Sequence, residues 1–198
     1  RGEPVYGEKD EVDLKKFAKA AKGLPFWLAG SYADPSKLCD VLDVGGAGIQ
    51  VGTAFSLSRE SGFESETKQK ILNNIAVKDM QVFTDPVASP TGFPFKVLKI
   101  PDTLSEPENY EARPRVCSLG YLRDIYKKPN GSLGYRCASE PVEDYVKKGG
   151  EIEATEGRKC LCNALCANVG CPQLQPKTGY LEDILITIGD DINNCKRY

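Results

Sequence analysis

The fold class is decided by residues 24–55, which read LPFWLAGSYADPSKLCDVLDVGGAGIQVGTAF. The run Pro25–Ala29 is short and continuously apolar, which is typical of a strand buried on both faces. A turn follows, and then Asp34 precedes Pro35. This pair predicts the start of a helix, because Asp caps helices and Pro is favoured at the first helical position.

The second half of this stretch repeats the pattern. Gly45 and Gly46 end the predicted helix. Gly48–Val51 is then a second short strand, and Gly52 turns the chain toward a further helix at Thr53. The helical connection is long enough to bring the second strand back parallel to the first. The sequence therefore predicts an α/β fold.

The two turns suggest an anion site. Ligands of parallel α/β folds bind beyond the carboxyl ends of the strands. Gly30 and Gly52 lack Cβ, so their backbone N–H groups can approach phosphate oxygens closely. Thr53 adds a hydroxyl where a helix N-terminus favours an anion. The alternative interpretation is that these glycines only terminate strands, as they do in any α/β protein.

The rest of the chain divides into two regions. Residues 10–22 and 66–77 have the apolar spacing of amphipathic helices, and residues 78–83 read as a strand. Further on, the chain becomes dense in Pro and Gly and loses sustained periodicity. We expect βα units in residues 1–84, and an irregular Cys-containing extension, packed on them without a core of its own, in residues 85–198.

Composition excludes several function classes. The net charge is −2 and the pI is 5.4, which argues against a basic nucleic-acid surface or a polybasic membrane patch. No apolar run approaches the roughly 20 residues that span a bilayer. We therefore expect a cytoplasmic protein with a small-molecule substrate and no nucleic-acid or membrane partner. The absence of His removes imidazole as a base or ligand in this sequence.

Eight cysteines leave three interpretations open: free thiols, a metal site and disulfides. Cys39 falls on the predicted apolar face of a helix, where a thiol packs as a small hydrophobe. Four more cysteines cluster in one segment: Cys160, Cys162, Cys166 and Cys171. Their spacings differ from the two-residue gaps of zinc ribbons. Cys117 or Cys137 would have to join Cys160 and Cys162 to complete four thiolates, and no metal ligand is assigned from the sequence.

Several segments together resemble one enzyme family. They are Leu28–Ser31, Gly45–Phe55, Ala88–Val97, Gly134–Cys137 and Gly157–Asn163. The first two resemble the end of the barrel in the nitronate monooxygenase (2-nitropropane dioxygenase-like) family of FMN enzymes. The last three are similar to a longer branch of that family with a C-terminal extension. The resemblance implies the C-terminal portion of a (β/α)8 TIM barrel plus an irregular, Cys-containing extension.

The resemblance also implies a set of cofactor-binding residues. FMN phosphate would be held by Gly30, Ser31, Gly52 and Thr53, with Gln50 and Val51 in the same loop. The family often has a second Gly where Ser31 stands. A Ser can still donate its N–H and hydroxyl there, but only if its φ stays in an ordinary region.

The activity that the resemblance implies is FMN-dependent oxidation of a nitronate-like carbanion with oxygen as acceptor. The family's usual catalytic His lies in a Gly-Gly-His stretch, and Arg1–Gly7 resembles the sequence just after it. We therefore expect a longer polypeptide, with the catalytic residue unknown, and in this part of it a cut sheet edge, an exposed apolar face and low stability. Two alternatives stay open: an NAD(P)H-dependent enoyl reductase on the same barrel, and a metal-binding Cys-rich structural module.

Other candidates have ordinary structural interpretations. Two carboxylate pairs are expected to be solvated, namely Glu182-Asp183 and Asp190-Asp191. Three arginines could reach an anionic substrate but are expected at the surface: Arg113, Arg115 and Arg136. Five aromatic residues could line a flavin-side pocket, although packing in the core is favoured: Phe93, Phe95, Tyr121, Tyr126 and Tyr135.

Overall fold

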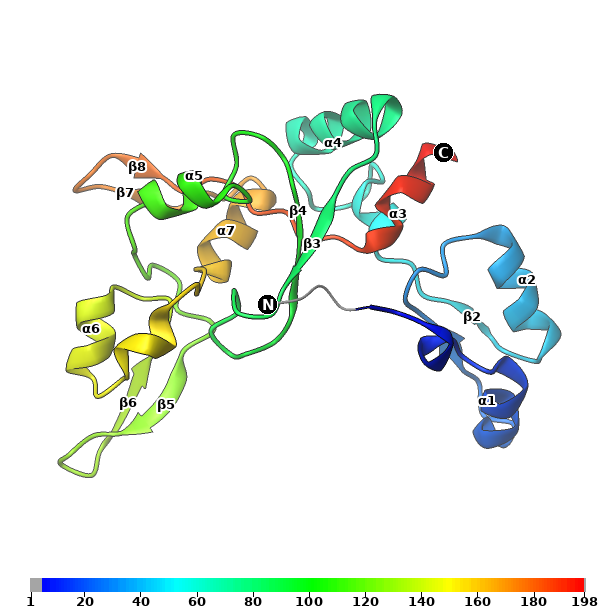
Figure 1. The fold of residues 1–198 in the computed structure, drawn as a ribbon, viewed down its shortest axis with the longest axis horizontal. Coiled ribbons are helices and arrows are strands. Elements are labelled where there is room, and N and C mark those ends of the chain that lie inside the picture. Colours follow the sequence, from blue (N-terminus) through cyan, green and yellow to red (C-terminus); the bar gives the residue numbers. More distant parts are fainter. Residues whose placement is uncertain (1–4, 198) are drawn as a thin grey trace. The chain divides into compact units, whose positions relative to one another are not determined.

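The computed structural model describes residues 5–197, which form two compact units (Figure 1). The first unit contains residues 5–81 together with residues 188–197, and the central unit is Val82–Thr187. This division differs from the expected boundary after residue 84. It also differs at the C-terminus, where residues 188–197 belong to the first unit and not to the extension.

The first unit is mainly helical. Its elements in chain order are η1 Glu8–Asp10, α1 Leu14–Ala21, β1 Trp27–Leu28, α2 Pro35–Asp43, β2 Gly48–Ile49, α3 Thr53–Ser56, α4 Ser65–Val77 and η3 Asp190–Arg197. Asp34 caps α2 as predicted, because its carboxylate accepts a hydrogen bond from the backbone N–H of Ser36 over 2.9 Å. Pro35 occupies the first turn of the same helix.

β1 and β2 are parallel neighbours joined through α2, which confirms the predicted pairing. Trp27 pairs with Gly48, and Leu28 pairs with Ile49. Both strands are shorter than predicted. The expected burial on both faces is wrong for Trp27, whose side chain is 52% exposed. A sheet with two strands, as in the described part of this chain, offers too little surface to bury side chains on both faces.

The N-terminal part of the first unit buries few apolar side chains. Helix α1 has no buried residue, although Phe17 packs edge-on against Phe26 with ring centroids 5.1 Å apart. Cys39 is exposed, so its predicted packing as a small hydrophobe is wrong. It lies two positions from the buried Val41, and positions two apart do not share a helix face. This part exposes many apolar residues: Val5, Tyr6, Val12, Phe17, Leu24, Trp27, Leu42, Val51 and Phe55.

The remainder of the first unit has a firmer core. Helix α4 occupies the predicted position and buries Ile71 and Ile75, while the neighbouring Leu72 is 38% exposed. η3 lies beside α3 and α4. The side chain of Asn193 in η3 bonds both backbone groups of Met80, accepting from its N–H over 2.8 Å and donating to its carbonyl over 3.0 Å.

The central unit consists of short elements. They are β3 Val82–Asp85, β4 Phe95–Leu98, α5 Pro107–Ala112, β5 Asp124–Lys127, β6 Leu133–Arg136, α6 Val142–Lys147, η2 Ile152–Thr155, α7 Leu161–Asn168, β7 Leu174–Gln175 and β8 Tyr180–Leu181. The strands form the antiparallel pairs β3–β4, β5–β6 and β7–β8. The strand predicted at residues 78–83 is β3, shifted toward the C-terminus. Asn-Gly pairs are a strong sequence signal for tight hairpin turns, and Asn130-Gly131 closes the β5–β6 hairpin, where Gly131 has a φ of +83°.

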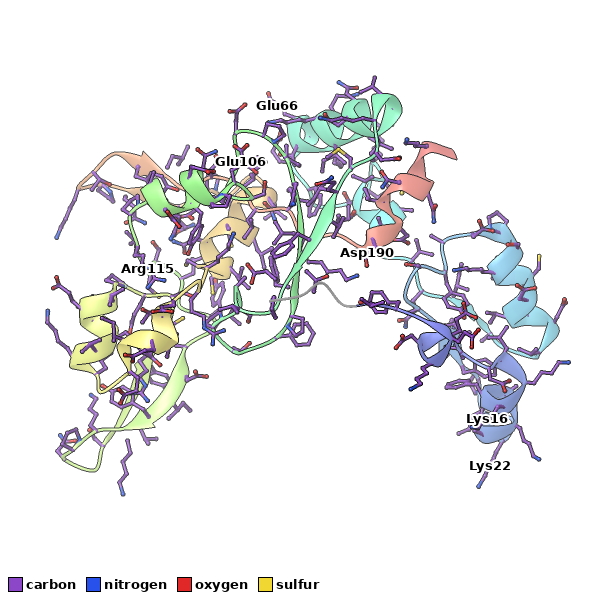
Figure 2. All side chains as sticks on the ribbon, in the orientation of Figure 1. Lys16, Lys22, Glu66, Glu106, Arg115 and Asp190 are labelled. Carbon is purple, nitrogen blue, oxygen red and sulfur yellow. The ribbon has the colours of Figure 1, made fainter. Side chains whose placement is uncertain are left out.

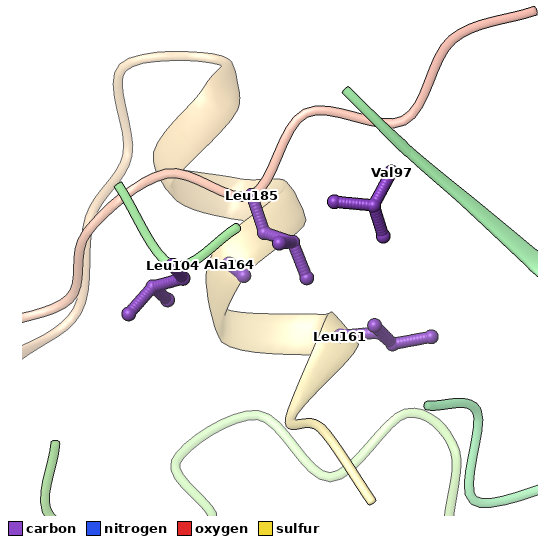
Figure 3. Close-up of a cluster of buried hydrophobic side chains, with 5 residues drawn as sticks. All are labelled: Val97, Leu104, Leu161, Ala164 and Leu185. Atoms are coloured by element: carbon purple, nitrogen blue, oxygen red, sulfur yellow. The ribbon is translucent and has the colours of Figure 1, made fainter. Parts of the chain in front are cut away.

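The central unit has a hydrophobic cluster of its own (Figure 3). Its members are Val97, Leu104, Leu161, Ala164 and Leu185. Two of them come from α7, and the others come from β4, the segment before α5 and the segment after β8. The expectation that this region lacks a core is therefore wrong. The four sheets in the described residues have two strands each, and no closed barrel is found among those residues.

Candidate functional site

The predicted phosphate loops both follow strands of the parallel pair. Gly30 and Ser31 come just after β1, and Gln50–Gly52 comes directly after β2. The backbone N–H of Gln50 donates to the carbonyl oxygen of Leu28 over 2.7 Å, so the pairing continues to the ends of the strands. Parallel neighbours have their carboxyl ends at the same edge. The two loops therefore lie together at one edge of the first unit.

The loop after β1 has a left-handed backbone. Gly30 has a φ of +83° and Ser31 a φ of +60°. Glycine adopts this region freely, whereas a residue with a side chain costs about 1–2 kcal/mol there. The condition that Ser31 stays in an ordinary region is thus not met, which weakens its assignment as a second donor. A Cβ on Gly30 would meet no atom within 4 Å, so the loop is open on that side.

Lys37 adds a positive charge that the sequence reasoning missed. Its Nζ donates to the carbonyl oxygen of Ser31 over 2.8 Å and lies 5.1 Å from the ring centroid of Tyr32. An ammonium group at a phosphate loop attracts anions. The sequence signal for this role is the position of Lys37 in the first turn of α2, three positions after the cap Asp34. From there a lysine side chain reaches back over the preceding loop.

Thr53 is not available as a side-chain donor to phosphate in this structure. The residue is buried, and its Oγ1 donates to Oδ1 of Asp191 over 2.5 Å and accepts the N–H of Gly189 over 3.2 Å. Gly189 leaves no room for a side chain, because a Cβ there would lie 2.5 Å from Oγ1 of Thr53. The cap of α3 is Gly52, and Thr53 is the first helical residue.

Asp191 changes the charge at this edge of the sheet. Its neighbour Asp190 is exposed at the start of η3, as predicted (Figure 2), but Asp191 is half-buried against Thr53. Burial first, and then the negative charge of Asp191, raises the pKa of the Cys195 thiol. The same charge opposes an anion at the Thr53 hydroxyl. The backbone of the two loops and the Lys37 ammonium are therefore left as the candidate groups for an anion.

Arg113 and Glu182, in the central unit, form a buried ion pair. Nε of Arg113 donates to Oε1 of Glu182 over 2.7 Å, and Nη2 donates to Oε2 over 2.9 Å. Burial acts to lower the pKa of Arg113, but the hydrogen bonds and charge of Glu182 outweigh it and raise that pKa. The predictions of a surface Arg113 and a solvated Glu182 are both wrong, because the bidentate geometry compensates the burial of both charges.

The other two predicted arginines also have structural partners. Nη2 of Arg115, labelled in Figure 2, donates to the carbonyl oxygen of Thr155 over 2.8 Å. The guanidinium of Arg136 lies 5.0 Å from the ring centroid of Tyr126 and 5.4 Å from that of Tyr145. These contacts account for both residues within the central unit, and neither one is assigned to a substrate.

The five candidate aromatic residues have different environments. Phe95 packs against the hydrophobic cluster of the central unit, and Tyr126 is half-buried beneath Arg136. The others are largely exposed, namely Phe93 at 72%, Tyr121 at 75% and Tyr135 at 53%. Packing in the core therefore holds for Phe95 and not for the exposed three.

Four cysteines of the central unit line one small pocket, the cysteine pocket. They are Cys117, Cys137, Cys160 and Cys162. The pocket has a volume of about 10 Å³, close to the least room that one water molecule needs. Sequence reasoning named Cys117 or Cys137 as the partner of the Cys160–Cys162 pair, and the structure brings both to it. None of the four forms a disulfide.

Three thiols of the cysteine pocket have a raised pKa and are held in the neutral form at pH 7. Burial raises the pKa of Cys160 to about 11, and burial also raises the pKa of Cys117 and Cys137. Activated cysteine nucleophiles have the opposite property, a lowered pKa. As the side chains are placed, no group of three potential ligands within residues 5–197 has metal-binding geometry.

Comparison with known proteins leaves the family open. No family model matches the chain, and no curated protein is significantly similar to it. No helix in the described part of the chain combines the length and apolar character needed to cross a membrane.

Proposed function

We propose that this chain contributes the FMN phosphate site of an FMN-dependent oxidoreductase resembling nitronate monooxygenases. The observation that carries the proposal is the parallel β1–β2 pair, which aligns the Gly30–Ser31 and Gln50–Gly52 loops at one edge. The family resemblance of these same segments supports it. When bound, FMN supplies the redox chemistry, taking electrons from a carbanion-like substrate and passing them to oxygen.

The residues of the two loops fit a phosphate group. At both Gly30 and Gly52 a Cβ would meet no atom within 4 Å, so phosphate oxygens can approach the backbone N–H groups. Lys37 supplies a counter-charge from α2. Thr53 has a different role, since its hydroxyl is bonded to Asp191 and holds the C-terminal segment against α3.

The test compares FMN with riboflavin, which lacks the phosphate, by titrating the quenching of flavin fluorescence. Wild type should bind FMN more tightly than riboflavin. Lys37→Met should weaken FMN binding roughly three- to tenfold and leave riboflavin binding unchanged, since it removes one exposed charge. Lys16→Met is the matched control, because Lys16 is an exposed lysine of the same unit on α1 (Figure 2).

A charge placed in the loop gives a stronger test. Gly52→Asp should weaken FMN binding about tenfold or more, since it brings a carboxylate to the phosphate. Gly52→Asn is nearly the same shape without the charge and should retain most of the affinity. The backbone φ of −97° at this position accepts either side chain. Equal FMN affinity in the Asp and Asn variants would refute the phosphate assignment.

Two assays on the flavin-loaded protein distinguish nitronate oxidation from the enoyl reductase alternative. Oxygen uptake with a nitronate supports the proposed activity. NAD(P)H oxidation that depends on an enoyl thioester, with no nitronate turnover, would instead support the enoyl reductase activity.

A further inference from the structure

We propose that the cysteine pocket of the central unit binds one thiophilic divalent cation, with Zn²⁺ as the probe, through Cys117, Cys137, Cys160 and Cys162. The inference is independent of the FMN site, because every residue that carries it belongs to the central unit. Its function would be structural: one ion would tie together three segments that are far apart in the sequence.

The three segments are already fastened together beside the cysteines. Oγ of Ser139 donates to the carbonyl oxygen of Lys159 over 2.8 Å, which joins the segment of Cys137 to that of Cys160. Nδ2 of Asn163 lies 3.4 Å from the carbonyl oxygen of Val116, which joins α7 to the segment of Cys117. The convergence of the thiols is therefore built into the backbone.

The other charged groups at the pocket have partners of their own. Glu140 accepts the N–H of Cys137 over 3.3 Å at one oxygen and the ammonium of Lys148 over 2.6 Å at the other. The ammonium of Lys159 lies 4.8 Å from the ring centroid of Tyr110. The four sulfur atoms are left as the donor set, and four sulfurs are the ligands that tetrahedral zinc prefers.

Binding requires the sulfurs to close on the ion, because the side chains as placed do not form a metal-binding group. A cysteine has one side-chain torsion before sulfur, and rotation about it moves Sγ between staggered positions without moving the backbone. The ligands bind as thiolates, so metal binding would displace the thiol protons to solvent.

The central unit is built from short elements that a bound ion would stabilise. Its sheets have two strands each, and its hydrophobic cluster contains five buried residues. Two-stranded sheets are marginal in isolation, and a bound metal can fix segments that such sheets do not hold together. An ion held by four sulfurs would fix the exit of β6 and the start of α7 relative to Cys117.

The experiment titrates the reduced protein with Co²⁺, whose thiolate complexes absorb strongly, and then displaces it with Zn²⁺. One equivalent should bind with sulfur-to-cobalt charge-transfer absorption, and Zn²⁺ should abolish that absorption. Cys162→Ser should weaken Co²⁺ binding at least tenfold. Cys171→Ser is the matched control, an exposed cysteine of the same unit outside the pocket, and should bind like wild type.

A second measurement uses the wild-type chain, so the proposal stays testable if a variant fails to fold. Zn²⁺ should protect the four pocket cysteines from alkylation, read by peptide mass, and leave Cys171 as reactive as before. The proposal would be overturned if no stoichiometric thiolate absorption appeared, or if Cys171→Ser lost as much Co²⁺ affinity as Cys162→Ser. It would also be overturned if Zn²⁺ did not change the alkylation of the pocket cysteines. A disulfide within the pocket that persists under reductant would overturn it as well.

Discussion

The proposed phosphate loops and the cysteine pocket are built from different kinds of groups. The loops after β1 and β2 consist of backbone and one exposed lysine, all within residues 30–52. The cysteine pocket consists of side chains from three distant segments, which are joined by partly buried hydrogen bonds. A site made from one local stretch can be predicted from its sequence but is weakly fixed by burial. A site made from distant side chains is firmly fixed but is not visible in any local pattern.

The largest expected effect comes from breaking the long-range ion pair of the central unit. Arg113→Met should lower the free energy of unfolding of the central unit by about 3–5 kcal/mol, because Glu182 is left buried and unpaired. The double variant Arg113→Met, Glu182→Met should recover most of that loss. Amide hydrogen exchange of α7 in a urea series measures the stability of the central unit in the single and the double variant. The fluorescence of Trp27, the one tryptophan, reports the first unit, which should change little.

If Arg113→Met left the central unit as stable as wild type, its long-range contacts would not fix it more firmly than the local stretch of the loops is fixed. A double variant no better than Arg113→Met would show that lost packing, and not the stranded carboxylate, accounts for the effect.

A smaller effect is expected from a buried amide of the same unit. Asn168 donates to the carbonyl oxygen of Leu185 over 2.8 Å and accepts its N–H over 3.0 Å. Asn168→Ala leaves two buried backbone groups without partners and should cost about 2–3 kcal/mol. Asn109→Ala is the control, because Asn109 is exposed. Equal urea midpoints for the two variants would contradict the prediction.

The features that the sequence predicted correctly have local signals. The Asp34-Pro35 pair predicts the start of α2, and the Asn130-Gly131 pair predicts the β5–β6 turn. The apolar runs on either side of α2 predict the parallel strands. In each case the residues that determine the structure lie within a few positions of one another, so propensity and turn chemistry suffice.

The features that the sequence missed depend on distant partners. Arg113 and Glu182 look like surface residues individually, and only the fold brings them together. Thr53 fits a phosphate loop until Asp191 reaches it from the C-terminal segment. Cys39 was misplaced for a different reason, because it lies two positions from the buried Val41 and does not share its helix face.

The bond between Thr53 and Asp191 offers an intermediate test, because it attaches a distant segment to the proposed phosphate loop. Thr53→Val should cost about 1 kcal/mol and loosen η3, since it leaves the half-buried carboxylate without its donor. Hydrogen exchange of η3 and α3 measures the change, with Thr178→Val, at an exposed position, as the control. FMN affinity should be retained. A large loss of FMN affinity with η3 unchanged would assign the hydroxyl to phosphate instead.

The smallest effect is expected at a purely local cap. The backbone N–H groups of Glu66 and Thr67 lower the pKa of Glu64, and the N–H of Thr67 donates to its carboxylate over 2.8 Å. A carboxyl whose folded pKa is lowered stabilises the fold above its unfolded value, here 4.5, and loses that contribution as pH falls through the folded pKa. Glu64→Gln should therefore loosen the first turn of α4 slightly at pH 7, and the difference from wild type should vanish well below pH 4.5. Hydrogen exchange of that turn at the two pH values measures it. A difference that persists at low pH would show that the side chain acts through packing and not through its charge, and the cap would then depend on more than its local sequence.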